Sequence, residues 1–131
     1  MPAVRPRKDI TLPVSQETFT IRRLSNWDLM EGGMPDPMRA LQLKQMQKIE
    51  PSLEDKLRVG MDPDVQRYQA RMALAAIMQA PEGMQLVIKD PKECTGAEFA
   101  WVDLDPQDQQ HLIRQVFDFI QEGAAEAATF P

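Results

Sequence analysis

Residues 62–79, DPDVQRYQARMALAAIMQ, carry the strongest folding signal in this chain. Asp62 is a favourable N-cap, and Pro63 is well tolerated in the first turn of a helix. The side chains of one face then recur at helical spacing, at Val65, Tyr68, Met72, Ala75, Ala76 and Gln79. Pro81 and Gly83 follow, and both residue types interrupt helices. We therefore predict a central helix over residues 63–79.

A short helix is predicted upstream of this centre. Ser25 followed by Asp28 has the form of a capping box, in which each residue bonds to the backbone of the other. The pattern predicts a helix over residues 26–31 that stops at Gly32 and Gly33.

Weaker signals lie between the short helix and the centre. Asp36 as N-cap, with Pro37 in the first turn, predicts a further helix that ends before Pro51. Residues 52–59 predict one more short helical turn.

A long helix is predicted downstream of the centre. Asp105 is a favourable N-cap, Pro106 fits the first helical position, and Asp108 adds a charge that suits the helix dipole. The helix should reach about Glu122 and end at Gly123. Its apolar stripe consists of Leu112, Ile113, Val116, Phe117 and Ile120.

Residues 9–23 alternate like β-strands. Ile10 and Leu12 alternate with polar neighbours, residues 13–16 favour a turn, and residues 18–21 alternate again. A hairpin is expected here, and it must pack on something else because two strands alone are marginally stable. Residues 84–89 and 99–104 are short apolar runs.

The fold class that follows is mostly α (α+β), a small helical domain with a short N-terminal β-hairpin. The expected organisation is a flexible basic arm over 1–8, a single globular domain over 9–122 and a tail over 123–131. A chain of 131 residues forms one modest core.

Charge is unevenly distributed along the chain, whose net charge is −5. Residues 1–24 carry +3 and residues 93–131 carry −7, so the two ends are expected to pair within the chain or between copies. The acidic balance argues against nucleic acid as a partner, although Arg5, Arg7 and Lys8 form a small basic cluster. The longest apolar run is too short to span a membrane, so no membrane partner is expected.

Candidate chemistry is sparse. Cys94 and His111 are the only residues of their types, and no third group orients them as a nucleophile and base. Asp103, Asp105 and Asp108 invite a metal-binding interpretation, but helix capping accounts for the last two. No phosphate-binding loop or paired-cysteine motif is present in the sequence. We therefore assign no catalytic, cofactor-binding or metal-binding residue and expect no enzyme activity.

Nine methionines are the most unusual feature of the composition. Methionine either fills helix cores or forms adaptable apolar surfaces that accept varied partners. Trp27 and Trp101 pose the same alternative, because large aromatic side chains either anchor the core or line a groove.

Several short motifs, in order, resemble those of the small tail assembly chaperones of long-tailed (siphovirus-type) phages and prophages. The resemblance rests on 19–24 (FTIRRL), the helix over 25–31, 33–37 (GMPDP), 86–91 (LVIKDP) and 102–108 (VDLDPQD). It covers most of the chain, although each motif is short.

The resemblance implies a non-enzymatic job in the host cytoplasm. Such chaperones bind the long tape measure protein and keep it soluble while tail tube subunits assemble around it. The tail tube protein and a second copy of the chain stay open as further partners. The rival interpretation is a structural virion component, such as a head–tail connector, neck or minor tail protein, in which the charged ends lock copies together.

Candidate partner-binding residues were sought on or beside the helices of the first two-thirds of the chain. They share large apolar side chains and comprise Trp27, Met30, Met34, Met38, Leu41, Met46 and Met72. Binding through them should depend on apolar burial rather than on salt-sensitive charge.

Overall fold

A computed structural model describes residues 4–129 of the chain and the side chains of residues 4–123. Its elements are β1 (Arg7–Thr11), β2 (Thr18–Arg22), α1 (Asn26–Glu31), α2 (Asp36–Met46), α3 (Leu53–Met61), α4 (Pro63–Ala76), β3 (Ile77–Gln79), η1 (Pro81–Gly83), β4 (Gln85–Val87), η2 (Pro91–Glu93), β5 (Glu98–Ala100), η3 (Trp101–Asp103) and α5 (Pro106–Thr129). The predicted fold class is confirmed: the protein is mostly α-helical with a short N-terminal antiparallel hairpin.

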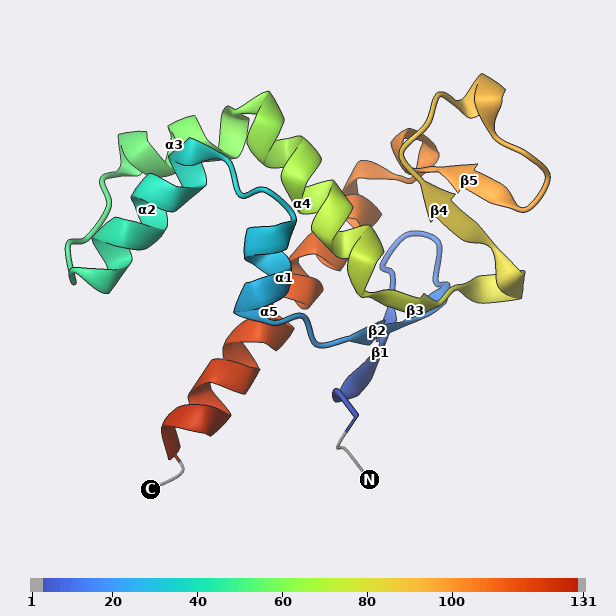
Figure 1. The fold of residues 1–131 in the computed structure, drawn as a ribbon. Coiled ribbons are helices and arrows are strands. Elements are labelled where there is room, and N and C mark those ends of the chain that lie inside the picture. Colours follow the sequence, from blue (N-terminus) through green and yellow to red (C-terminus); the bar gives the residue numbers. More distant parts are fainter. Residues whose placement is uncertain (1–3, 130–131) are drawn as a thin grey trace.

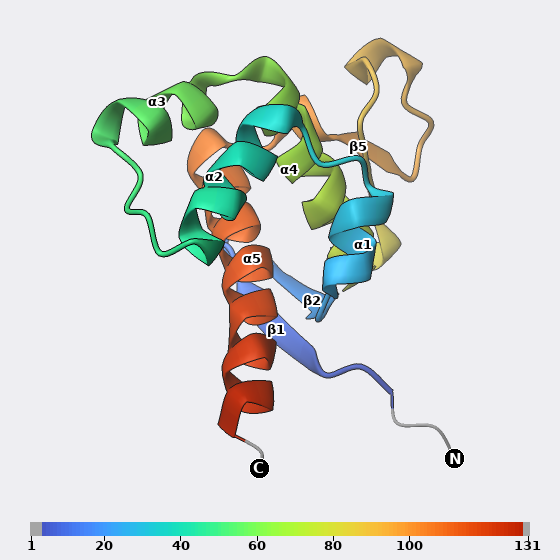
Figure 2. The same ribbon diagram turned by 60° about the vertical axis from the view of Figure 1, so that its left-hand side comes forward.

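The three-dimensional arrangement places α4 and α5 at the centre (Figure 1). The β1–β2–β3 sheet lies beside them, the α2–α3 pair stands to one side, and the small parallel β4–β5 pair lies on the opposite side. In the turned view α2 lies in front of the upper part of α5 (Figure 2), and residues of the two helices line one cavity.

The core forms where the sheet meets α1, α4 and α5. Its fully buried side chains include Leu12 and Phe19 from the hairpin region, Tyr68 from α4 and Leu112 from α5. The Tyr68 hydroxyl donates a hydrogen bond of 2.7 Å to the Leu29 carbonyl, so α4 fixes the position of α1. Burial raises the pKa of Tyr68 and keeps its hydroxyl protonated as a donor.

Three of the predicted N-caps are present. Ser25 and Asp28 form the complete capping box of α1, and the Asp62 side chain accepts bonds from the first backbone N–H groups of α4. Asp105 accepts from the Gln107 N–H at the start of α5. For α2 the expectation was wrong: Pro35 is the N-cap, and Asp36 is already the first helical residue.

The central helix is shorter than predicted. α4 ends at Ala76, and Ile77–Gln79 forms β3, which pairs antiparallel with β2. Ile77 lies opposite Ile21, so pairing with a distant strand overrides the local helical spacing. The expected two-stranded hairpin thus becomes part of a three-stranded sheet.

The predicted chain ends need two corrections. β1 begins at Arg7, so the last two residues of the predicted arm belong to a strand. α5 continues through Gly123 to Thr129, so most of the predicted 123–131 tail is helical, and residues 130–131 lie outside the described part. A Cβ at position 123 would lie 2.8 Å from Cδ of Arg23, which means that the glycine allows a close approach instead of ending the helix.

The buried face of α5 also differs from the predicted stripe. Leu112 and Val116 are buried as expected, and so is Phe119, which the prediction omitted. Ile113, Phe117 and Ile120 are only partly buried against the core. Phe117 and Ile120 also line a cavity together with residues of α2. This displacement of the stripe leaves apolar side chains available for a surface groove.

Candidate partner-binding groove

Two adjoining grooves run along α2. The α2–α5 groove has a cavity volume of about 340 Å³ and is lined by Asn26, Leu29, Met34, Met38, Leu41, Gln42, Gln45, Val59, Gln69, Phe117, Ile120 and Gln121. The α1–α2 groove, of about 400 Å³, is lined by Asn26, Leu29, Met30, Met34, Arg39, Gln42 and Met46. The two grooves adjoin because they share four lining residues, Asn26, Leu29, Met34 and Gln42.

Local sequence explains how the walls form. On α2, Met38, Leu41 and Gln45 follow one another at helical spacing and line the same groove. On α5, Phe117 and Ile120 do the same from the opposite side. The groove is therefore bounded by two helix faces that do not pack tightly on each other.

Five of the seven predicted contact residues line this surface. Met30 and Met46 lie in the α1–α2 groove, Met38 and Leu41 in the α2–α5 groove, and Met34 in both. The structure thus brings together side chains that span 17 positions of sequence.

The other two predicted residues behave differently. Trp27 lies on α1 with 67% of its surface exposed, outside the lining of either groove. Met72 is buried and lies against Gly32. A Cβ added at position 32 would overlap the terminal methyl of Met72. The prediction was wrong for Met72, which packs in the core. Of the two tryptophans, Trp101 is the buried one.

Sequence reasoning missed part of the apolar surface. Leu53, Leu57 and Met61 are exposed along one face of α3, and their spacing of four residues is a signal that could have found them. Phe117 and Ile120 were assigned to the core, because the sequence does not show which helix faces a groove. Val59 was likewise not included.

The α2–α3 pair has no buried residue on either helix. An ion pair of 2.8 Å between Lys44 and Asp55 joins the two helices. This bond lowers the pKa of Asp55 and keeps the carboxylate charged. Met38, Leu41 and Val59 are half-buried. The exposed large apolar side chains of the two helices are Leu43, Met46, Leu53, Leu57 and Met61.

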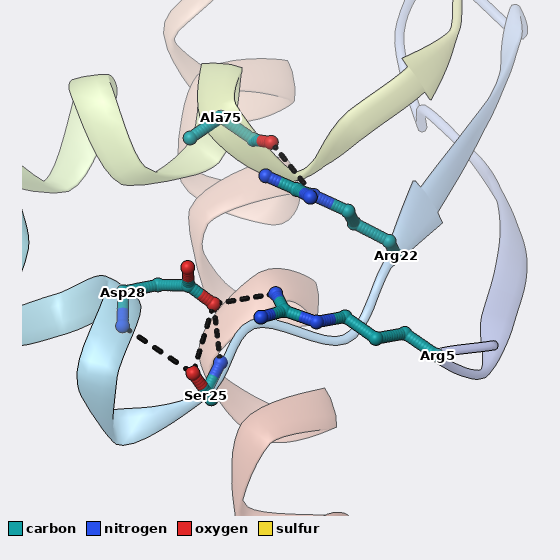
Figure 3. A network of polar contacts seen from close by, with 5 residues as sticks. All are labelled: Arg5, Arg22, Ser25, Asp28 and Ala75. Atoms are coloured by element: carbon teal, nitrogen blue, oxygen red, sulfur yellow. Dashed lines mark hydrogen bonds and ion pairs between the residues drawn. The ribbon is translucent and has the colours of Figure 1, made fainter. Parts of the chain in front are cut away.

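A polar network fixes α1, which provides one wall of the α1–α2 groove (Figure 3). The Asp28 carboxylate accepts hydrogen bonds from the Ser25 N–H and hydroxyl and forms an ion pair with Arg5. Nearby, Nε of Arg22 donates to the Ala75 carbonyl at 3.3 Å and connects the sheet to α4. Arg5 therefore ties the N-terminal segment to the groove wall.

We expect Asp28→Asn to lower the free energy of unfolding by about 1 kcal/mol near neutral pH, because it weakens the capping box. Burial alone would raise the pKa of Asp28, but the bonds from Ser25 and Arg5 outweigh it and hold the pKa below 3.8. The stabilisation is therefore complete above the unfolded value and is lost as pH falls through the lowered folded value.

Urea unfolding of both proteins across the acid range measures this difference, which should shrink as pH falls. Asp36→Asn, at a side chain that is 95% exposed, is the control. A difference that stays constant down to about pH 2 would contradict the role of the charged carboxylate.

The charged ends of the chain pair internally in the described region. Lys8 of the basic N-terminal region lies 3.5 Å from Glu122 of the acidic C-terminal region. Arg5 instead pairs with Asp28, which lies outside the acidic region. Of the two pairings that the sequence left open, the one within the chain is present.

The acidic residues considered as metal ligands diverge. Asp105 caps α5, whereas the buried Asp108 accepts from the Val14 and Ser15 N–H groups at 2.8 and 3.0 Å. Within residues 4–123, no three His, Cys, Asp or Glu side chains converge as a metal site would require. Cys94 follows η2, where its thiol lies 3.7 Å from the Asp90 carbonyl oxygen. None of the described helices has the length and apolarity needed to cross a membrane.

Comparison with known proteins gives no match: no family model fits the chain, and neither a curated protein nor a solved structure is significantly similar to it.

Proposed function

We propose that this chain is a non-enzymatic tail assembly chaperone of a long-tailed phage or prophage. It binds apolar helical segments of the tape measure protein in the host cytoplasm and keeps that protein soluble until the tail tube assembles around it. The motif resemblance suggests this role, and the apolar surface around α2 supports it.

The observation that carries the proposal is the concentration of exposed apolar side chains on α1–α3 and their flanks. Of thirteen large apolar side chains exposed among residues 4–123, eight lie between positions 27 and 61: Trp27, Met30, Leu43, Met46, Ile49, Leu53, Leu57 and Met61. Two of them, Met30 and Met46, line the α1–α2 groove. Exposed apolar surface on soluble proteins often marks an interaction site when it is contiguous.

The composition of the surface fits a long and varied client. Methionine side chains are flexible and polarizable, so Met30, Met34, Met38 and Met46 adapt to different apolar partners. The amphipathic-helix-in-groove mode of recognition uses side chains at intervals of three and four residues. A client with many such helices would present this surface with many similar binding segments.

The rival role as a structural virion component requires charged ends that join neighbouring copies. Arg5 and Lys8 instead contact Asp28 and Glu122 of the same chain. The oligomeric state separates the two roles: symmetric ring packing of copies would favour the virion component, and a monomer or dimer that binds an extended client would favour the chaperone.

Co-expression with a tape measure protein tests the proposal. The client should be soluble and co-purify with the native chain, and Met34→Asp combined with Met38→Asp should lower the recovered complex at least about tenfold, because both side chains line the groove. Raising the salt concentration should leave the complex intact.

The matched control is Met78→Asp combined with Val102→Asp, two exposed apolar positions outside both grooves. Thermal unfolding of each variant separates a lost interface from a lost fold. The proposal fails if the client is equally soluble without this protein, or if the groove variant and the control recover the same amount of complex.

A further inference from the structure

The α2–α3 hairpin, residues 36–61, is attached to the rest of the protein by few contacts. No residue of either helix is buried. Within this fully described segment, Met38 is the one apolar side chain that packs against the buried core. Leu41 and Val59 are half-buried and line the α2–α5 groove. Figure 1 shows the hairpin standing to one side of α4. Segments with so little buried surface are those that open locally while the core stays folded.

The polar contacts of the hairpin are mostly internal. Lys44 forms its 2.8 Å ion pair with Asp55 on the neighbouring helix, and Arg58 pairs with Glu54 within α3. Among residues 4–123, no hydrogen bond or ion pair joins α2 to α1, α4 or α5. The two helices are therefore joined to each other by a strong polar contact, whereas only apolar side chains hold α2 against α5.

The chain enters the hairpin through a pair of glycines that differ in their surroundings. Gly32 is fixed to α4, because its carbonyl accepts a hydrogen bond of 3.2 Å from Arg71 and its backbone lies against Met72. Gly33 has a φ of +76°, and a Cβ at this position would meet no atom within 4 Å. A glycine with free space around it changes its backbone angles at low cost. Gly33 is thus a hinge directly beside a fixed point.

The chain leaves the hairpin in a similar way. Asp62 is fixed to α4, where it accepts from the Asp64 and Val65 N–H groups at 2.8 and 3.1 Å. Gly60 lies two positions earlier, inside α3, and a Cβ there would also meet no atom within 4 Å. Glycine weakens a helix, and no neighbouring atom requires its small size at this position. The 3.2 Å bond from Gln66 to the Gly60 carbonyl connects the hairpin to α4 at this end only.

We propose that the α2–α3 hairpin is a lid on α5 that opens as a unit at Gly33 and Gly60 while the core stays folded. Opening moves Leu41 away from Phe117 and Ile120, which line the α2–α5 groove from the other side. Hinge movements of this kind confine the backbone changes to a few residues at the ends of elements. The width of the groove is therefore adjustable. The movement is a property of this chain alone, so its test needs no client and is independent of the chaperone role.

Distances between pairs of spin labels test the movement in the full-length chain. Cys94→Ser removes the one native cysteine, and cysteines are then introduced in pairs at exposed positions. Lys56→Cys with Gln110→Cys reports on the lid relative to α5. Ala75→Cys with Gln110→Cys reports on α4 relative to α5, and Leu43→Cys with Lys56→Cys reports on the inside of the lid.

The first pair should show two distances, for the closed and open lid, and each of the other pairs should show one. A single narrow distance between Lys56 and Gln110 overturns the proposal. Two distances between Leu43 and Lys56 also overturn it, because the helices then separate instead of moving together. Two distances between Ala75 and Gln110 overturn it as well, because the body of the protein would then move.

The contacts that hold the lid closed are tested by Leu41→Ala. Truncation of this half-buried side chain removes apolar contact with α5, so the share of the longer Lys56–Gln110 distance should rise at least about threefold. Leu43→Ala is the matched control, because Leu43 lies on the same helix, is 54% exposed and does not line the groove. Equal shares of the longer distance in the two variants would overturn the proposal.

The hinge is tested by Gly60→Ala. Alanine stiffens the helix at this position, so the share of the longer distance should fall at least about threefold. Gly96→Ala is the matched control, since a Cβ at position 96, before β5, would also meet no atom within 4 Å. Thermal unfolding of each variant confirms that the core is retained. A longer-distance share that Gly60→Ala leaves unchanged, or that both variants change equally, would overturn the assignment of the hinge.

Discussion

Phe119→Ala is expected to lower the free energy of unfolding by about 3–5 kcal/mol, the cost of removing a large aromatic side chain from a core. Phe119 is only 4% exposed. The Arg23 guanidinium lies 4.5 Å from the ring centroid, and the Lys8 ammonium lies 5.7 Å from it. The substitution therefore removes two cation–π contacts in addition to the buried surface.

Phe117→Ala is the matched control on the same helix. Phe117 is partly buried and lines the α2–α5 groove, so its loss should cost less than about half as much stability and should weaken client binding instead. Urea unfolding measures both variants. Equal losses of stability, or a loss below about 1 kcal/mol for Phe119→Ala, would contradict the described core.

Asp108→Ala is expected to cost about 2–3 kcal/mol, because a buried carboxylate that accepts two hydrogen bonds is removed. Its side chain is 1% exposed, and its two oxygens accept from the Val14 and Ser15 N–H groups in the turn between β1 and β2. The substitution leaves those donors without their acceptor and loosens the attachment of the hairpin turn to α5.

Asp105→Ala is the comparison at the N-cap of the same helix. Asp105 is exposed, and its loss should cost about 1 kcal/mol. Hydrogen exchange at the amides of Val14 and Ser15 provides a second measurement and should accelerate in Asp108→Ala alone. Unchanged exchange at these two amides would rule out the proposed attachment.

Local signals predicted the starts of α1, α4 and α5 well. The side chains of Ser25, Asp62 and Asp105 bond to backbone groups two or three positions away, so the sequence contains both partners. The helix ends were predicted less well when a distant segment decided them. Ile77 belongs to β3 because Ile21 pairs with it, 56 positions earlier.

Asp108 illustrates the same limit for a single side chain. Its place in the first turn of α5 predicts a charge that suits the helix dipole. The structure instead buries it against a turn 93 and 94 positions away, a partnership with no local signature. Likewise, Gly123 has the sequence of a helix terminator, but its lack of a side chain accommodates Arg23.

Amino-acid composition predicted part of the candidate site. An excess of methionine pointed to the region around α2, and five predicted residues line the two grooves there. Helical spacing alone did not separate Met72, which packs in the core, from Met38, which lines a groove. The residues that α5 contributes to the α2–α5 groove depend on how distant helices meet.

The bond between Asp108 and the hairpin turn also bears on events during translation. At about 5–20 residues per second, the ribosome needs about 5–20 s to add the 94 positions between Val14 and Asp108. The third strand of the N-terminal sheet, β3, follows α3 in the chain, so the sheet stays incomplete while α1, α2 and α3 are already made. Because α5 supplies the second groove wall, the nascent chain acquires its finished groove only after nearly all of the described residues have been synthesised.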